Sequence, residues 1–140
     1  INPLRDYIPL ARRAKVRYKL MDYEGAILDF TNAIEESTPE DTHYLYFYGR
    51  ALASYDLKNF QNSRDDLTEA IKLIEDEYGE YDELPPNIKN VLPNIEKIYK
   101  YLGQCCVKLG DIKNALQYLI MASKLGDNEA PSLHKKYCTN

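Results

Sequence analysis

The sequence predicts an all-α domain made of repeated helix pairs, and three observations support this fold class. First, Leu20–Ile34 aligns with Leu57–Ile71 at an offset of 37 residues, and the latter aligns with Leu109–Ser123 at an offset of 52. Second, apolar residues recur at three- and four-residue steps, which places them on one face of a helix. Third, a residue suited to helix N-capping stands at the third position of each aligned segment, just before its predicted helix.

A first helical segment precedes each of these repeats. The alignment extends upstream, where Ala14 matches Ala51 and then Gly103. A capping residue followed by proline is expected to open the first segment in two units, at Asn2-Pro3 and at Thr38-Pro39. Each unit is therefore predicted to be a pair of helices.

The second segments begin after predicted N-caps and carry two small residues each. The caps are Asp22, Asn59 and Asp111, whose side chains should accept from the first free backbone N–H groups. Small side chains let helix backbones approach, and large ones fill the remaining space. The small residues are Ala26, Ser63 and Ala115, then Ala33, Ala70 and Ala122. Because one helix pair cannot bury its apolar face alone, the units should share a continuous core.

An interruption precedes the third unit, and one more helix follows it. The offset of 52 exceeds the about 34 residues typical of such repeats, and the extra residues lie within Glu75–Pro93. We expect the second helix to extend to about Glu77, followed by a Pro-Pro turn and a short helix. This insert is either a tolerated connector or a partner-binding or regulatory segment. After Gly126, Asp127 or Asn128 should cap a terminal helix.

These features resemble the tetratricopeptide repeat (TPR) family. The resemblance is closest in Tyr18–Glu35 and Tyr101–Gly126 and covers nearly the whole chain. It implies a right-handed superhelix of about three TPR helix-turn-helix pairs plus a C-terminal capping helix. Met21 and Lys58 stand where the family commonly has Gly. The closing segment Ala122–Ala130 also resembles a Sel1-type repeat, a close relative.

The predicted organisation is a single TPR domain over residues 1–140. Its expected parts are repeat 1 at about 3–37, repeat 2 at about 38–77, an insert at about 78–93, repeat 3 at about 94–126 and a capping helix at about 128–138. Because the chain begins at Ile1 and not at methionine, we expect a trimmed, processed or excised segment of a larger protein.

The composition limits the classes of partner. Charged residues are 29% and hydrophobic residues 44%, as in globular proteins, and the net charge of −4 argues against a general nucleic-acid binder. The apolar runs are too short to span a bilayer. Three cysteines do not make a disulfide framework, and adjacent Cys105 and Cys106 suit a reduced, buried helix. We therefore expect a cytoplasmic protein with no nucleic-acid or membrane partner.

The sequence offers no catalytic, metal or cofactor signature. His43 and His134 lack ligand partners at zinc-site spacing. A glycine-rich phosphate loop and a nucleophile signature are both missing. The acidic pairs Glu35-Glu36 and Asp65-Asp66 diverge by about 100° on a helix and are expected on solvated faces. We predict that the chain is not an enzyme and needs no cofactor or metal.

Function should therefore lie in a surface. The resemblance implies that the first helices line a concave, peptide-binding groove. The predicted groove residues are Lys15, Tyr18, Lys19, Tyr48, Leu52, Tyr55, Lys97, Lys100, Gln104 and Lys108. Lysines around an aromatic floor suit an acidic segment or a free C-terminal carboxylate. Arg12, Arg13 and Arg17 add positive charge around the first helix, although lysines on an exposed helix also serve solubility alone.

The leading hypothesis is a non-catalytic protein–protein interaction module, a scaffold or adaptor that binds a peptide or partner protein within a larger chain or complex. The alternatives are a structural spacer or self-association element of a larger protein, and a TPR-type secretion chaperone. Family members that bind the Glu-Glu-Val-Asp tail of heat-shock chaperones use a two-carboxylate clamp. Most of its positions are unmatched here, so we expect no standard clamp. An RNA-binding helical repeat would need paired base-contacting polar residues in every unit. The sequence does not show such pairs, so we do not expect RNA binding.

Overall fold

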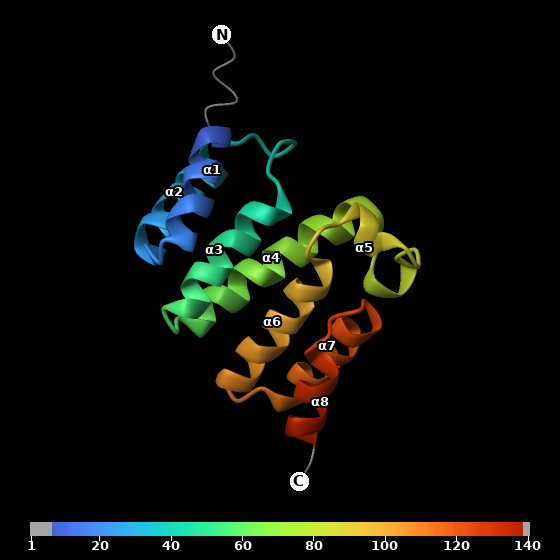
Figure 1. Cartoon of the computed structure of the whole chain (residues 1–140). Helices are drawn as coiled ribbons and strands as arrows, with labels where there is room; N and C mark the ends of the chain where they lie inside the picture. Colours follow the sequence, from blue (N-terminus) through green and yellow to red (C-terminus); the bar gives the residue numbers. More distant parts are fainter. Residues whose placement is uncertain (1–6, 139–140) are drawn as a thin grey trace. The chain divides into compact units, whose positions relative to one another are not determined.

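The structure is a computed structural model that describes residues 7–138, and every regular element in this range is helical (Figure 1). The elements are α1 (Tyr7–Lys19), α2 (Tyr23–Glu36), α3 (Tyr44–Asp56), α4 (Phe60–Tyr78), the 3₁₀-helix η2 (Tyr81–Glu83), α5 (Ile88–Val91), α6 (Ile95–Lys108), α7 (Ile112–Lys124) and α8 (Ala130–Cys138). None of the described helices is long and apolar enough to cross a membrane.

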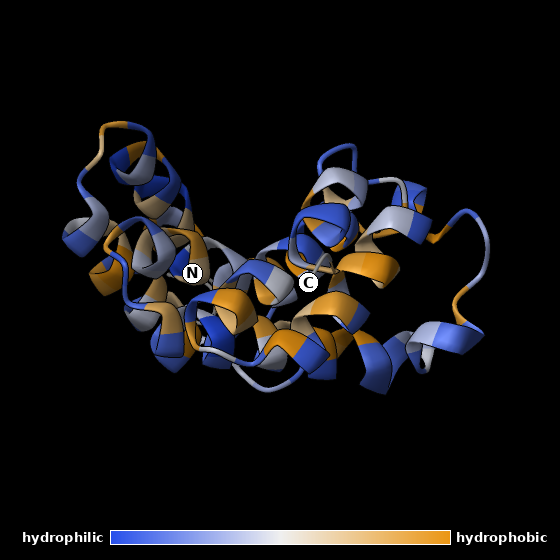
Figure 2. Cartoon of the chain, turned by 90° about the horizontal axis from the view of Figure 1, so that it is seen from below, coloured by the Kyte–Doolittle hydropathy of each residue, from blue (hydrophilic) through white to orange (hydrophobic). Residues whose placement is uncertain are grey.

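The helices form two compact units, whose boundary falls inside α4 between Ala70 and Ile71. In the first unit α1 packs on α2, and α2 packs on α3. In the second unit α6 packs on α7, and α7 packs on α8. Hydrophobic and hydrophilic residues lie on different sides of the same helices, as amphipathic packing requires (Figure 2). The predicted all-α fold class of helix pairs with a C-terminal capping helix is confirmed.

Small residues lie at the helix contacts, as the repeat pattern predicts. The alanines of these positions are all fully buried: Ala14, Ala26, Ala33, Ala51, Ala70, Ala115 and Ala122. Ser63 is equally buried, and its hydroxyl donates a 2.9 Å hydrogen bond to the Ala51 carbonyl across the pair. The equivalent large residues Phe30, Leu67 and Leu119 fill the core beside them.

Two helical glycines mark the tightest contacts. A methyl group added at Gly103 would lie 2.8 Å from Leu119 Cγ and 3.2 Å from the Ala115 carbonyl oxygen, both on α7. A methyl group added at Gly49 would clash with the ring of Phe30 on α2. At these two positions the neighbouring helix therefore lies too close for any residue larger than glycine.

The turns inside the three helix pairs have the same geometry. Met21, Lys58 and Gly110 occupy aligned positions and have φ values of 64°, 63° and 86°. The following residue in each turn donates a 2.8 Å hydrogen bond to the carbonyl five residues earlier, which is the Schellman pattern. Glycine adopts this left-handed conformation freely, whereas Met21 and Lys58 adopt it under strain.

The predicted caps of the second helices are confirmed. Asp22, Asn59 and Asp111 each accept a hydrogen bond from the backbone N–H three residues on, at 3.0, 3.3 and 3.3 Å. Asp127 caps α8 by accepting from the N–H groups of Glu129 and Ala130 at 2.9 and 2.8 Å. Each second helix and the terminal helix therefore begins where the sequence signal places it.

The predicted opening of the second unit at Thr38-Pro39 is wrong, because α3 begins later, at Tyr44. Its N-cap is His43, whose Nδ1 accepts from the Leu45 N–H at 3.1 Å. Thr38 instead closes a separate turn, in which its carbonyl accepts from the N–H of Asp41 at 3.0 Å. The expected opening of the first unit at Asn2-Pro3 lies outside the described residues.

The insert between α4 and α6 belongs to the second unit and packs against α6 and α7. Ile88 and Leu92 are buried. The Tyr81 ring meets the Tyr99 ring edge-on at 5.5 Å between centroids, and the Tyr81 hydroxyl donates to the Met121 carbonyl at 3.2 Å. The insert is therefore part of the apolar packing of this unit.

Substituting Gly103→Ala tests the close approach of α6 and α7. In an open helix this change stabilises by about 0.5–1 kcal/mol. Here the methyl group must displace Leu119, so we expect a loss of about 1–3 kcal/mol in the free energy of unfolding. Urea unfolding followed by circular dichroism measures it, with exposed Gln117→Ala on α7 as the control. A gain in stability for Gly103→Ala would contradict the tight contact.

Substituting Met21→Gly tests the strained turn. Met21 is 72% exposed, so little packing is lost, and glycine removes the cost of a positive φ. We expect the free energy of unfolding to rise by about 1 kcal/mol, measured by urea unfolding. The same change at exposed Leu20, which has no positive φ, should lower stability, and equal effects at both positions would contradict the explanation.

Candidate functional site

Helix α1 has one side that is bound to α2 by an ion-pair cluster. Arg13 donates to both carboxylate oxygens of Asp29, from Nε and Nη2, each at 2.8 Å. Arg17, one turn later, places Nη1 3.1 Å from Asp29 Oδ2. Asp29 is fully buried, and the hydrogen bonds from Arg13 lower its pKa from the usual range. This cluster joins the two helices of the first pair.

The second pair repeats this contact with the same atoms. Arg50 donates from Nε and Nη2 to the two oxygens of Asp66 at 2.9 and 2.7 Å, and both residues lie 37 positions after their counterparts in α1 and α2. The expectation that Asp65-Asp66 lies on a solvated face is therefore wrong for Asp66, which is 8% exposed, and correct for Asp65. The third pair has Leu102 and Tyr118 at these positions.

The opposite side of α1 carries cationic side chains that form no ion pair with the described part of the chain. Arg12, Lys15 and Lys19 are exposed, and no described residue forms an ion pair with them. They follow one another at steps of three and four residues, which aligns them along the helix. Val16, within the same stripe, is 56% exposed. Arg13 and Arg17, which the sequence suggests as further free charge, are instead engaged by Asp29.

Tyrosines connect this stripe to α3. The Tyr18 hydroxyl donates a 2.5 Å hydrogen bond to Asp56 Oδ2, and its ring lies 5.5 Å from that of Tyr23. Leu52 and Tyr55 are half-buried on α3. Tyr48 is only 8% exposed, so it contributes little accessible area. We call the surface formed by Lys15, Tyr18, Lys19, Leu52 and Tyr55 the α1–α3 face.

On α6 the predicted groove residues differ in how accessible their side chains are to a ligand. Lys97 and Lys108 are exposed and Gln104 is half-buried. Lys100 is 6% exposed, and its Nζ lies 3.3 Å from Glu129 Oε1, just before α8, and 4.6 Å from the centroid of the Tyr101 ring. Lys100 therefore has an intramolecular acidic partner, and nothing in the local sequence signals a contact with a residue 29 positions away.

The described residues include no grouping of three or more His, Cys, Asp and Glu side chains that could hold a metal ion. Cys105 and Cys106 are both buried and form no disulfide, as expected for residues inside a packed helix.

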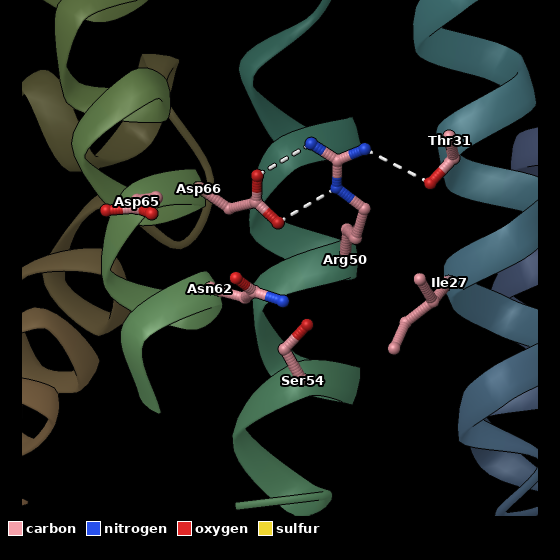
Figure 3. A pocket seen from close by; sticks show the side chains of 7 residues that line it. All are labelled: Ile27, Thr31, Arg50, Ser54, Asn62, Asp65 and Asp66. Carbon is pink, nitrogen blue, oxygen red and sulfur yellow. Dashed lines mark hydrogen bonds and ion pairs between the residues drawn. The ribbon is translucent and has the colours of Figure 1, made fainter. Parts of the chain in front are cut away.

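A hollow of about 390 Å³ lies between α2, α3 and α4 in the first unit (Figure 3). It is lined by Ile27, Thr31, Arg50, Ser54, Asn62, Asp65 and Asp66. Arg50 also donates from Nη1 to the Thr31 hydroxyl at 3.1 Å. No single motif in the sequence predicts this hollow. The 16-residue spacing of arginine and aspartate, repeated in two units, could have indicated the ion pairs around it.

Comparison with known proteins supports the fold. No protein-family model matches the chain, and the search of curated proteins finds no match. Among solved structures, the N-terminal domain of stress-induced protein-1 from C. elegans is 20% identical, with a TM-score of 0.73, covering 99% of this chain and 100% of that one.

Two further solved structures contain bound peptides. The second TPR domain of human RPAP3, in complex with the HSP70 peptide SGPTIEEVD, is 19% identical with a TM-score of 0.74, covering 99% of this chain and 100% of that one. The first TPR domain of Spaghetti (RPAP3), bound to the HSP90 peptide SRMEEVD, is 18% identical with a TM-score of 0.72, covering 96% and 92%. The chain has the TPR fold. The Sel1-like character of its closing segment stays a prediction.

Substituting Asp29→Asn tests the ion-pair cluster through pH. Because the folded pKa of Asp29 is lowered, its contribution to stability is present above the unfolded value of about 3.9 and is lost as the pH falls through the folded pKa. We expect Asp29→Asn to lower the free energy of unfolding by about 2 kcal/mol at pH 7. The difference from the unmodified chain should shrink below about pH 4.

Urea unfolding at pH 7 and pH 3 measures this effect, with exposed Glu36→Gln on the same helix as the matched control. A difference that stays constant between the two pH values, or a control that loses as much stability as Asp29→Asn, would be inconsistent with the lowered pKa.

Proposed function

We propose that this chain is a non-catalytic protein-binding module and that its α1–α3 face binds a peptide segment with acidic groups or a free C-terminal carboxylate. The observation that carries the proposal is the side of α1 with Arg12, Lys15 and Lys19, whose charges have no ion-pair partner among residues 7–138. Helix α1 contains no acidic residue at all. Three unneutralised cations beside half-buried aromatic side chains suit an acidic ligand.

The physical basis is a division of roles within the face. Exposed lysines attract an acidic segment over a distance and select its orientation. Tyr18, Leu52 and Tyr55 offer apolar area that a peptide can cover. The peptides in the two TPR complexes end in Glu-Glu-Val-Asp, which combines paired carboxylates, a branched side chain and a terminal carboxylate. That chemistry fits the α1–α3 face.

The second unit offers a weaker version of the same chemistry. Lys97 and Lys108 are exposed on α6, and we include them and Gln104 as ligand contacts of this unit. Lys100 is not included as a free cation, because Glu129 already neutralises it. A Lys100→Glu variant is a poor test of binding, since it would place a new carboxylate beside Glu129 and near buried Glu96 and so disturb the fold.

Titration with the peptide SGPTIEEVD by isothermal calorimetry tests the proposal. The Lys15→Glu/Lys19→Glu variant should bind about fourfold more weakly or more, because two attractions of about 0.2–1 kcal/mol each become repulsions. The matched control is Lys72→Glu/Lys113→Glu, which reverses two exposed lysines on second helices. It should bind as the unmodified chain does. A C-terminally amidated peptide should bind more weakly to all of them.

Equal weakening by both double variants would mean that overall charge, and not the α1–α3 face, attracts the peptide. Absence of binding to the unmodified chain at millimolar peptide would contradict the proposal of an acidic ligand. Light scattering of the same samples separates the self-association alternative, since only that alternative requires the mass to rise with concentration.

A further inference from the structure

The first two helix pairs build the same ion pair but give it different numbers of cations. Asp29 is approached by two guanidinium groups, those of Arg13 and Arg17. Asp66, its counterpart 37 residues later, is approached by Arg50 alone among the residues that the structure describes. The second pair is therefore one cation short of the first.

The difference in the number of cations comes from one position of the repeat. Arg17 aligns with Ser54, which also lies 37 residues later. Ser54 is only 4% exposed, it lines the hollow, and its hydroxyl makes no hydrogen bond with a described residue. Figure 3 shows the Ser54 hydroxyl directed into the space beside Arg50 and Ile27. Where the first pair places a guanidinium group, the second pair has an open hollow with the Ser54 hydroxyl on its wall.

The charge around this hollow is more negative than that in the first pair. In the first pair Arg13 and Arg17 are balanced by Asp29 and by Asp22, whose Oδ2 lies 3.9 Å from Arg17 Nε, so this cluster carries no net charge. The hollow is lined by Arg50, Asp65 and Asp66, and so carries one net negative charge, because Asp65 replaces Leu28 of the first pair. A cation entering the hollow would restore the balance that the first pair achieves within the chain.

We propose that this hollow binds the guanidinium group of an arginine side chain supplied by a partner protein. The group would take the place of Arg17 in the first pair and form an ion pair with Asp66 Oδ2, as Arg17 Nη1 does with Asp29 Oδ2 at 3.1 Å. The Asp65 carboxylate and the Ser54 hydroxyl supply two more acceptors, and Ile27 faces the methylene groups. The volume of about 390 Å³ lies within the range of about 300–1,000 Å³ usual for ligand pockets.

Arginine fits this site better than lysine. Its planar group offers five N–H donors in a fixed fork, which can serve the Asp65 and Asp66 carboxylates and the Ser54 hydroxyl together. A lysine ammonium is a more strongly hydrated point charge, so its desolvation costs more. The chain itself uses arginine at the equivalent position.

The site is separate from the α1–α3 face. Arg50 and Ser54 lie one turn apart on one side of α3, whereas Leu52 and Tyr55 lie on the other side of the same helix. The proposal therefore goes beyond the acidic-peptide function, and either proposal can fail without the other. A partner can contact both sides of α3 with segments of opposite charge.

Titration with N-acetyl-arginine amide, followed by two-dimensional NMR of the labelled chain, tests the proposal. We expect saturable shifts at the backbone amides of Thr31, Ser54 and Asp65 and at the side-chain amide of Asn62. The neutral isostere N-acetyl-citrulline amide should cause no saturable shift at these groups, because it lacks the charge that the hollow requires.

Two variants make the test specific. Ser54→Arg places a guanidinium group where the first pair has one, so the variant should fold and lose the arginine-induced shifts. Asp65→Asn should weaken binding about tenfold, the loss expected for one charge-assisted hydrogen bond. Exposed Asp76→Asn, further along α4, is the matched control and should bind as the unmodified chain does.

The proposal is overturned if arginine amide causes no saturable shift at the hollow, or if the citrulline compound causes the same one. It is also overturned if Asp65→Asn binds as well as Asp76→Asn. Should Ser54→Arg fail to fold, the pair of aspartate variants still decides the outcome, because both residues are exposed and neither is needed for packing.

Discussion

The close approach of the two helices in each pair is the constraint on which the rest of this structure depends. Ala14, Ala51 and Gly103 stand at the same place in three successive pairs, and each is fully enclosed by its partner helix. At Gly103 the distance leaves no room for a methyl group. With the spacing fixed in this way, large residues such as Phe30 and Leu119 fill the core beside the contact, and a short turn with a positive φ closes each pair.

The same spacing divides each first helix into a structural side and an available side. On α1, Arg13 is drawn onto Asp29, while Lys15 and Lys19 point to solvent. On α3, Arg50 is drawn onto Asp66, while Tyr55 lies on the other side. The differences between repeats then become functional candidates. An extra arginine in the first pair completes an ion cluster, and a serine at its place in the second pair leaves a hollow.

Much of the fold could be predicted because local signals carry it. Caps such as Asp22 and small residues such as Ala26 act over a few positions, and their recurrence in three copies makes them recognisable. The predicted helix start at Thr38 was wrong because a capping residue before proline suits an isolated turn as well as a helix. The pairing of Lys100 with Glu129 could not be foreseen, since it depends on where the terminal helix begins in space. Whether a residue is available to a ligand can be predicted from the sequence only when its contacts within the fold can also be predicted.

The most direct test of the central claim is where an acidic peptide binds. Amide chemical shifts of the labelled chain, recorded with and without SGPTIEEVD, locate the contact independently of affinity. The largest saturable shifts should fall on α1 and α3, around Lys15, Tyr18 and Tyr55, with little change on α2 and the first half of α4. Shifts centred on α2 and α4 instead, or no saturable shift anywhere, would contradict the assignment of function to the first helices.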